Sequence, residues 1–282
     1  MNNNEIFNKA YNKALNGGIA GSMAMGVQVC SMMWLRTTLN YQYKNGGTFT
    51  GNLKTLYSQG GVFRFYKGVF PALLQAPLSR FGDTAANIGV LTYLDYNPNT
   101  KDLPVSVKTF CGSLIAGLWR INLMPIDTMK TMNQVHGNNA LYIIKDKIKI
   151  HGIRSLYHGS MGAFSTTVIG HFPWFFTFNY LSETIPKPEG KTFKKFGRFA
   201  LIGFTSSFIS DTISNFSRVI KVSRQTSEAG KSYTQITKDI VKEKGITELF
   251  GRGLKTKIII NGIQGLVFAV AWKSFDEYLN RN

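Results

Sequence analysis

The chain has 282 residues, of which 44% are hydrophobic and 13% aromatic, and this composition excludes a disordered protein. Lysine and arginine number 33 against 15 acidic residues, so the net charge of +18 predicts an anionic partner. Charge alone leaves nucleic acid, an anionic membrane surface and acidic small molecules open as that partner.

Cysteine usage and the first residues limit the chemistry and the targeting of the chain. Cys30 and Cys111 are the two cysteines, both in apolar segments, so we expect two buried thiols, with neither a disulfide framework nor a metal site. The opening stretch "MNNNEIFNKAYNKALNGG" has no apolar core and no Arg/Ser-rich amphipathic pattern. We therefore expect no secretory signal and no cleaved transit peptide, and any targeting information to be internal.

Glycines and basic residues recur at matching offsets, which indicates an internal repeat. In each copy a glycine is followed 18 residues later by Arg or Lys, and 29 or 32 residues after that by a second glycine. The three sets are Gly18, Arg36 and Gly68; Gly112, Lys130 and Gly159; and Gly203, Lys221 and Gly253. This spacing predicts three tandem repeats within one integral domain, over residues 1–94, 95–188 and 189–282.

Each repeat contains an apolar segment, a polar amphipathic segment and a second apolar segment. The apolar segments are long enough for spanning helices of about 20 residues, although none is an uninterrupted apolar run. Small residues such as those in "GGIAGSMAMG" favour close helix packing in a membrane bundle, and a soluble helical array is the alternative. We therefore expect an all-α membrane protein with six transmembrane helices at Lys13–Leu39, Val69–Leu94, Lys108–Gln134, Ser160–Thr184, Phe196–Gln225 and Leu254–Leu279.

The second repeat places Pro125, Asp127 and Lys130 inside an apolar segment. Pro125 should kink the helix because it removes a backbone hydrogen bond. Asp127 and Lys130 are three residues apart and share a helix face, which we expect to point at the pseudo-threefold axis. The equivalent positions are Ser31, Met33 and Arg36 in the first repeat, and Phe216, Arg218 and Lys221 in the third. Asp127 is thus the single carboxylate facing four cations, so at most one full salt bridge can form there.

The stretch "PIDTMK", followed by the tripeptide "YHG" at Tyr157 to Gly159, resembles the signature of the mitochondrial carrier family. The resemblance implies a six-helix barrel in the mitochondrial inner membrane, whose central substrate site opens alternately to each side. It implies that both termini lie on the intermembrane-space side. It also implies short matrix-side helices at Gly51–Gly60, Asn139–His151 and Tyr233–Lys244. The matrix gate would consist of Arg36, Asp127, Lys130, Arg218 and Lys221.

Two ionisable residues lie on the cavity side of the first helices of their repeats. Ten residues before the basic residue of each repeat stand Gly26, Arg120 and Asp211. Ten residues turn a helix through about 1000°, which returns to within a quarter-turn of the starting face. Arg120 and Asp211 are therefore candidates for substrate binding near mid-membrane. The alternative is that they pair with one another or with another helix.

The second helices of the repeats supply further candidates at a similar depth. Arg80 and Asp83 could bind substrate or satisfy each other across one helical turn. His171 could be a substrate or proton ligand, or a hydrogen-bonded core histidine. Trp174 could contribute to recognition or to packing alone.

Asn261 and Gln264 would add neutral hydrogen bonds to this central layer. Because arginine pairs bidentately with carboxylates and phosphates, the mildly positive balance favours a small anionic metabolite. No cofactor is expected. The resemblance implies that glycines at the helix starts hold cardiolipin as a structural lipid, and a tight turn without ligand is the alternative. Those glycines are Gly51, Gly68, Gly159 and Gly253.

The function expected from these features is solute transport by a monomer that contacts a small-molecule substrate and anionic membrane lipid. An enzyme is disfavoured, because there are four histidines, no G-x-S-x-G sequence and no P-loop. Nucleic-acid binding is disfavoured because the basic residues are dispersed and form no known binding motif. The alternative that stays open is a carrier-fold membrane protein without transport activity, acting as a scaffold, a lipid-binding protein or a regulator.

Overall fold

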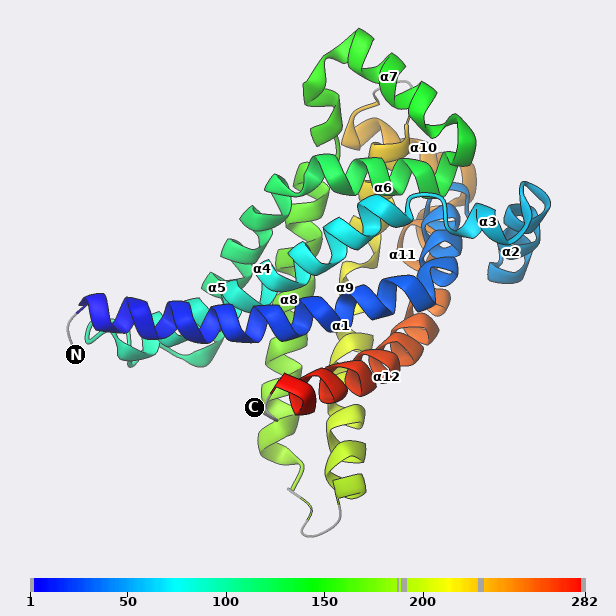
Figure 1. Ribbon diagram of the computed structural model, residues 1–282. Coiled ribbons are helices and arrows are strands. Elements are labelled where there is room, and N and C mark those ends of the chain that lie inside the picture. Colours follow the sequence, from blue (N-terminus) through cyan, green and yellow to red (C-terminus); the bar gives the residue numbers. More distant parts are fainter. Residues whose placement is uncertain (1–2, 187, 189–191, 228–230, 280–282) are drawn as a thin grey trace.

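The computed structural model describes residues 3–186, 188, 192–227 and 231–279, and Figure 1 shows their arrangement. In this part of the chain all regular structure is helical, which confirms the all-α prediction. The long helices are α1 (Asn3–Asn45), α4 (Val69–Tyr96), α5 (Val105–Asn122), α6 (Met124–His136), α8 (Ser160–Thr184), α9 (Thr192–Thr226) and α12 (Leu254–Leu279). Between them lie α2 (Phe49–Ser58), α3 (Gly61–Phe65), α7 (Ala140–His151), α10 (Tyr233–Lys244), α11 (Ile246–Gly251) and the 3₁₀ turns Gly137–Asn139 and Ile153–Tyr157.

The helix positions follow the sequence pattern closely. Helices α8, α10 and α12 have the predicted bounds, whereas α1 begins earlier and extends six residues beyond the predicted end at Leu39. The first repeat boundary, at residues 94 and 95, falls within the last turn of α4. The second boundary adjoins residue 189, which lies outside the described residues.

The long helices of the described chain close into a ring (Figure 1). Helix α1 packs against α4, α4 against α5, α5 against α8, α8 against α9, α9 against α12, and α12 against α1. Helix α6 continues the direction of the chain from α5 and contacts α1, α4 and α9. The two long elements predicted for each repeat are therefore neighbours in the ring.

Two long helical segments, α1 and the α5–α6 segment, are interrupted close to Pro125 or to the position predicted to correspond to it. The helix of the second repeat is divided at Leu123, so α6 begins at Met124 with Pro125 in its first turn, where proline is tolerated. Helix α1 has non-helical backbone angles at Met32 (φ −117°, ψ 17°). There the Ser31 hydroxyl donates to the Val27 carbonyl at 2.9 Å, and such back-bonding bends helices. The break in α1 therefore lies next to a serine, whereas the break between α5 and α6 lies next to a proline.

Basic side chains of the short segments donate hydrogen bonds to backbone carbonyls at the carboxyl ends of α1, α6 and α9. Arg64 donates to the carbonyls of Gln134 and Val135, at 3.0 and 2.9 Å. Lys147 donates to the carbonyl of Gln225 at 2.9 Å, at the end of α9. Arg252 donates in the same way to the last carbonyls of α1. These carbonyls have no partner within their own helices, so each cation stabilises one helix end.

Backbone conformation and close packing both require glycine at the positions before α4, α8 and α12. Gly68, Gly159 and Gly253 have φ values of 86°, 103° and 70°, which disfavour any residue with a side chain. A Cβ added at these three glycines would lie 2.9, 2.8 and 2.9 Å from side-chain atoms of α6, α9 and α1, respectively. These turns therefore set how closely neighbouring repeats approach.

His158 lies in the turn between α7 and α8, surrounded by basic groups. Burial, first, and then the charges of Arg224, Lys147 and His151 together lower the pKa of its imidazole to about 4. Its Nδ1 atom is buried without a hydrogen-bond partner. Protonation of this histidine therefore opposes the folded state.

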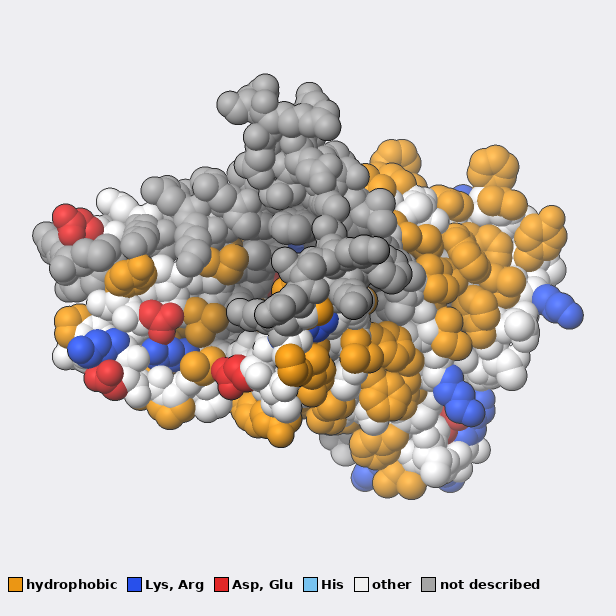
Figure 2. Space-filling view, turned by 90° about the horizontal axis from the view of Figure 1, so that it is seen from below, with side chains coloured by type: hydrophobic (Ala, Val, Ile, Leu, Met, Phe, Trp, Pro, Cys, Tyr) orange, Lys and Arg blue, Asp and Glu red, His pale blue; other side chains and the backbone are white. Residues whose placement is uncertain are grey.

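The outer surface of the ring is rich in exposed apolar side chains. Figure 2 shows hydrophobic side chains gathered over much of the described surface on one face. Every long helix exposes at least one large apolar residue, among them Val27, Phe70, Leu118, Met129, Met161, Leu201 and Ile259. Within the described residues, no single helix has both the length and the apolarity required to cross a membrane. Cys30 is also exposed, so the expectation of two buried thiols was wrong for this residue.

Candidate functional site

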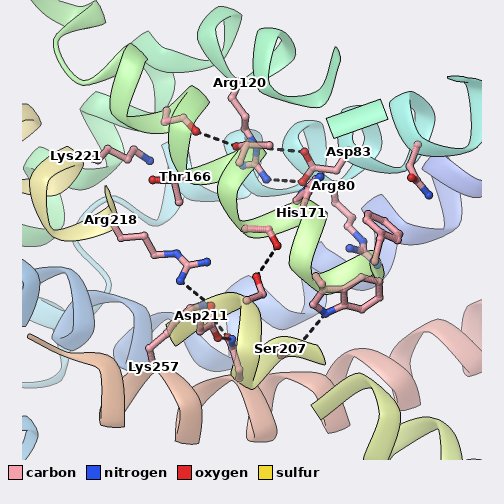
Figure 3. A pocket seen from close by; sticks show the side chains of 18 of the residues that line it. Arg80, Asp83, Arg120, Thr166, His171, Ser207, Asp211, Arg218, Lys221 and Lys257 are labelled. Atoms are coloured by element: carbon pink, nitrogen blue, oxygen red, sulfur yellow. Dashed lines mark hydrogen bonds and ion pairs between the residues drawn. The ribbon is translucent and has the colours of Figure 1, made fainter. Parts of the chain in front are cut away.

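Two adjoining cavities of about 550 and 560 Å³ lie among the long helices and share much of their lining. Their walls come from α1, α4, α5, α6, α8, α9 and α12. Figure 3 shows the cavity of about 550 Å³. The acidic residues that line them are Asp83, Asp127 and Asp211. The basic residues that line them are Arg36, Arg80, Arg120, Lys130, Arg218, Lys221 and Lys257. Among the described residues the cavities are therefore strongly basic, with seven cations against three carboxylates.

Asp83 and Arg120 form an ion pair that joins α4 to α5. The Arg120 guanidinium donates through both Nε and Nη2 to the two carboxylate oxygens, with 3.3 Å from Nε to Oδ1. Such a two-point contact fixes the plane of the guanidinium. Arg80 lines both cavities beside this pair and feels the charges of Asp83 and Arg120. Asp83 thus forms an ion pair across helices, and Arg120 pairs with α4 rather than with Asp211.

Asp211 contacts polar side chains of α9 and α12. Arg218 Nη1 lies 2.7 Å from Asp211 Oδ1, although that buried nitrogen makes no well-directed hydrogen bond. The amide of Asn261 donates to the other carboxylate oxygen, and Lys257 donates to Asn261 Oδ1 at 2.7 Å. Arg218 therefore faces Asp211 and not Asp127, which corrects the expectation that four cations share Asp127.

Asp127 is the centre of a second cluster, at the α6 end of the cavity. Its side chain is buried, and its two oxygens lie 2.6 Å from Lys130 Nζ and 2.6 Å from Lys221 Nζ. Gln225 also donates to Oδ2 at 2.9 Å, and Lys130 donates to Gln75 at 3.0 Å. One carboxylate thus holds two ammonium groups, one from its own helix and one from α9. The expectation of at most one salt bridge was wrong.

Arg36 lies in the same layer but has neutral partners. Its Nη2 donates to the amide oxygen of Gln28 and lies 3.4 Å from the sulfur of Met25. Gln28 in turn donates to the backbone carbonyl of Gln264 at 2.7 Å. Gln264 is itself buried, and its Nε2 has no partner. The α1 and α12 side of the cavity is therefore lined by amides rather than by acids.

Aromatic side chains of α8 form one wall of the cavity. Trp174 donates to the Ser207 hydroxyl at 3.1 Å and stacks on Phe178 with ring centroids 5.0 Å apart. His171 lines the cavity and meets Phe175 edge to face at 5.9 Å. The hydrogen bond and the stacking fix the Trp174 ring, so this wall is preorganised. Whether His171 and Trp174 contact a substrate stays a prediction.

Three of the four glycines predicted to hold lipid directly precede a long helix, and the fourth does not. Gly51 lies in the first turn of α2, where its N–H already donates to the side chain of Thr48 at 3.2 Å. Its amide is therefore engaged by the helix cap. A lipid role for Gly51, Gly68, Gly159 and Gly253 stays a prediction.

Lys257 and Gln225 belong to the site, and sequence reasoning missed both. Lys257 stands four residues before Asn261 on α12, and Gln225 stands four residues after Lys221 on α9. Side chains four residues apart share a helix face, so counting one turn from known positions could have found them.

The chemistry of the site is that of charge recognition. In the part of the chain that the structure describes, no group of His, Cys, Asp and Glu side chains could hold a metal ion. The cavity offers guanidinium and ammonium donors, amides and one aromatic wall. Such a lining suits reversible binding of an anion.

Comparison with known proteins agrees with the signature motif. Residues 101–189 match the family model described as "Mitochondrial carrier protein". Over 137 residues the chain is 30% identical to "Calcium-binding mitochondrial carrier SAL1" of Saccharomyces cerevisiae, covering 43% of this chain and 24% of that protein. Over 169 residues it is 30% identical to "Solute carrier family 25 member 16" of Homo sapiens, covering 50% and 51%. The chain is thus similar to the mitochondrial carrier family over residues 101–189, and its matches span about half or less of these relatives' length.

Proposed function

We propose that the protein is a solute transporter of the mitochondrial inner membrane that carries a small anionic metabolite bearing carboxylate or phosphate groups. The observation that carries this proposal is the basic cavity within the ring, lined from every long helix. A ligand there would be surrounded by donors from all three repeats. Because seven cations face three carboxylates, an anion gains more from entering than a neutral or cationic solute does.

The distribution of side chains supports a membrane location. Polar and charged residues of the long helices line the cavity, whereas large apolar residues such as Phe70, Met161 and Ile259 are exposed and line neither cavity. Ionisable residues of membrane helices face the bundle interior or a water-filled space. This inside-out arrangement supports a six-helix, pseudo-threefold barrel, and we further propose that both termini lie on the intermembrane-space side.

The Asp127 cluster supplies a means of closing one end of the cavity. Its ion pair with Lys221 joins α6 to α9, and Asn40 donates to Gln134 at 2.5 Å to join α1 to α6. Both contacts connect different repeats. We infer that they break when this end opens to the matrix and that substrate crosses by alternating access.

The ligands and partners of this proposal are a small-molecule substrate and anionic membrane lipid, with cardiolipin at the helix starts. The working unit would be the monomer, because the ring closes within one chain. The chemistry is non-enzymatic, since binding and release require no bond to be broken.

The test is uptake of labelled metabolites by liposomes that contain the purified protein. The test variants are Arg120→Gln, Asp83→Asn and their double combination, which removes the pair while keeping the cavity charge unchanged. We expect wild-type protein to take up an anionic metabolite and each single variant to reduce the rate at least tenfold. The matched control is Asp239→Asn with Lys231→Gln, a solvent-exposed pair on α10 and the segment before it.

A parallel thermal-shift screen of metabolites, with and without cardiolipin, separates the proposal from its alternative. A transported ligand raises the melting temperature as its concentration passes its Kd. If no metabolite is taken up or raises the melting temperature while cardiolipin does, the proposal fails. The protein would then be a non-transporting scaffold or lipid-binding member of the family.

A further inference from the structure

Three cations, one each from α1, α9 and α12, line the same cavity, and one carboxylate, Asp211, is paired with one of them. Arg36, Arg218 and Lys257 all line the 560 Å³ cavity. Lys257 is repelled by the positive charges of Arg218 and Arg36 and attracted by the negative charge of Asp211. This corner is defined here as the Arg36–Arg218–Lys257 corner, and it carries two uncompensated positive charges.

Among the described residues, the corner has one acid, Asp211, for three cations. Asp127 is fully engaged by Lys130 and Lys221, so it does not compensate the corner. The contacts of Arg36 are a glutamine and a methionine sulfur, and that of Lys257 is an asparagine.

Arg218 is paired with Asp211 but can engage a further anion. Its buried Nη1 lies 2.7 Å from Asp211 Oδ1 and makes no well-directed hydrogen bond, so this contact is mainly an ion pair. A guanidinium has five N–H donors, and a second anion could accept from those that Asp211 does not engage.

We propose that the Arg36–Arg218–Lys257 corner binds a small inorganic dianion of the sulfate or phosphate class. Its oxygens would accept from the two guanidinium groups and from the ammonium, and its two negative charges would neutralise the corner. At the level of Asp127, the α6–α9 contact is closed by an ion pair within the protein. The α1–α9–α12 contact would be closed by the bound anion, which would act as an exchangeable replacement for a carboxylate. The inference extends the proposed function, but its binding test does not require transport.

The experiment measures sulfate binding to purified, lipid-free full-length protein in detergent, at constant ionic strength balanced with chloride. Sulfate is the probe because its charge does not change near neutral pH. We expect a saturable rise in melting temperature that follows the logarithm of sulfate concentration above Kd. Arg36→Gln and Lys257→Gln should each weaken sulfate binding at least tenfold. Lys242→Gln, an equal charge loss at an exposed position of α10, should leave the Kd unchanged.

A charge-reversal variant keeps the proposal testable if the neutral variants fold poorly. Lys257→Glu places a carboxylate in the corner, so this protein should be stable without sulfate and insensitive to added sulfate. Absence of saturable binding by wild-type protein, or an unchanged sulfate response in Lys257→Glu, would overturn the proposal.

Added cardiolipin tests whether the oxyanion could be a lipid head group. A sulfate Kd unchanged by cardiolipin supports a free dianion inside the cavity, and a Kd raised by cardiolipin contradicts it. Failure of uptake with sulfate binding intact would reject the transport proposal alone, whereas loss of sulfate binding with uptake intact would reject the corner alone.

Discussion

Asp127→Asn removes the charge at the centre of the cluster that joins α6 to α9 while nearly preserving the shape of the side chain. The wild-type carboxylate is 4% exposed and lies 2.6 Å from each of two ammonium groups. In the variant, Lys130 and Lys221 keep their charges but lose their common counter-ion. Breaking a buried ion pair by removing one partner costs about 3–5 kcal/mol of unfolding free energy. At about 2–4 °C per kcal/mol for a chain somewhat smaller than this one, the melting temperature should fall by roughly 6–20 °C.

The assay is thermal unfolding of the purified protein in detergent, with the same substitution at a surface position as the control. Asp239→Asn removes the carboxylate of an exposed pair, which contributes little to stability. Adding Lys221→Met to Asp127→Asn removes one unpaired ammonium, so the double variant should be more stable than the sum of the single effects predicts. The reasoning is refuted if Asp127→Asn behaves like Asp239→Asn, or if the two substitutions in the cluster are simply additive.

Three further predictions concern the regions around the cavity. Arg64→Lys should lower the unfolding free energy by about 1.5–3 kcal/mol in a denaturation experiment, because an ammonium cannot reproduce the two-carbonyl contact at the end of α6. Gly253→Ala should lower the melting temperature because its φ is 70° and its Cβ would meet a ring at 2.9 Å, whereas Gly251→Ala, with open space around it, should not. The unfolded chain protonates His158 near pH 6.5 but the folded protein near pH 4, so stability is complete above about pH 6.5 and falls as the pH drops toward 4. His158→Gln should therefore reduce the difference in melting temperature between pH 7.5 and 5, and an unchanged difference would contradict the assignment.

Local pattern was sufficient to place the helices. The bounds of α8, α10 and α12 agree with the sequence prediction because apolar runs and turn glycines mark these ends directly. The break before Pro125 has a local cause as well. The break in α1 was not predicted, since a serine that bonds back to a carbonyl is not distinguishable in sequence from one that does not.

The site was predicted in composition but not in its pairings. The sequence determined that Arg80, Asp83, Arg120 and Asp211 would occur at similar depths, since helical periodicity fixes the face and the level of each residue. Helical periodicity could also have predicted the pairing of Arg218 with Asp211, because the two residues are seven apart on one helix and share a face.

The tertiary structure decided which charge meets which. Asp83 pairs with Arg120 because α4 and α5 are neighbours in the ring. Asp127 takes Lys221 from another repeat because α6 contacts α9. An ion pair depends on a few ångströms between helices that are distant in sequence, and periodicity along one helix contains no information about that distance. The same limit applies to the Arg36–Arg218–Lys257 corner, which exists only once three helices are brought together.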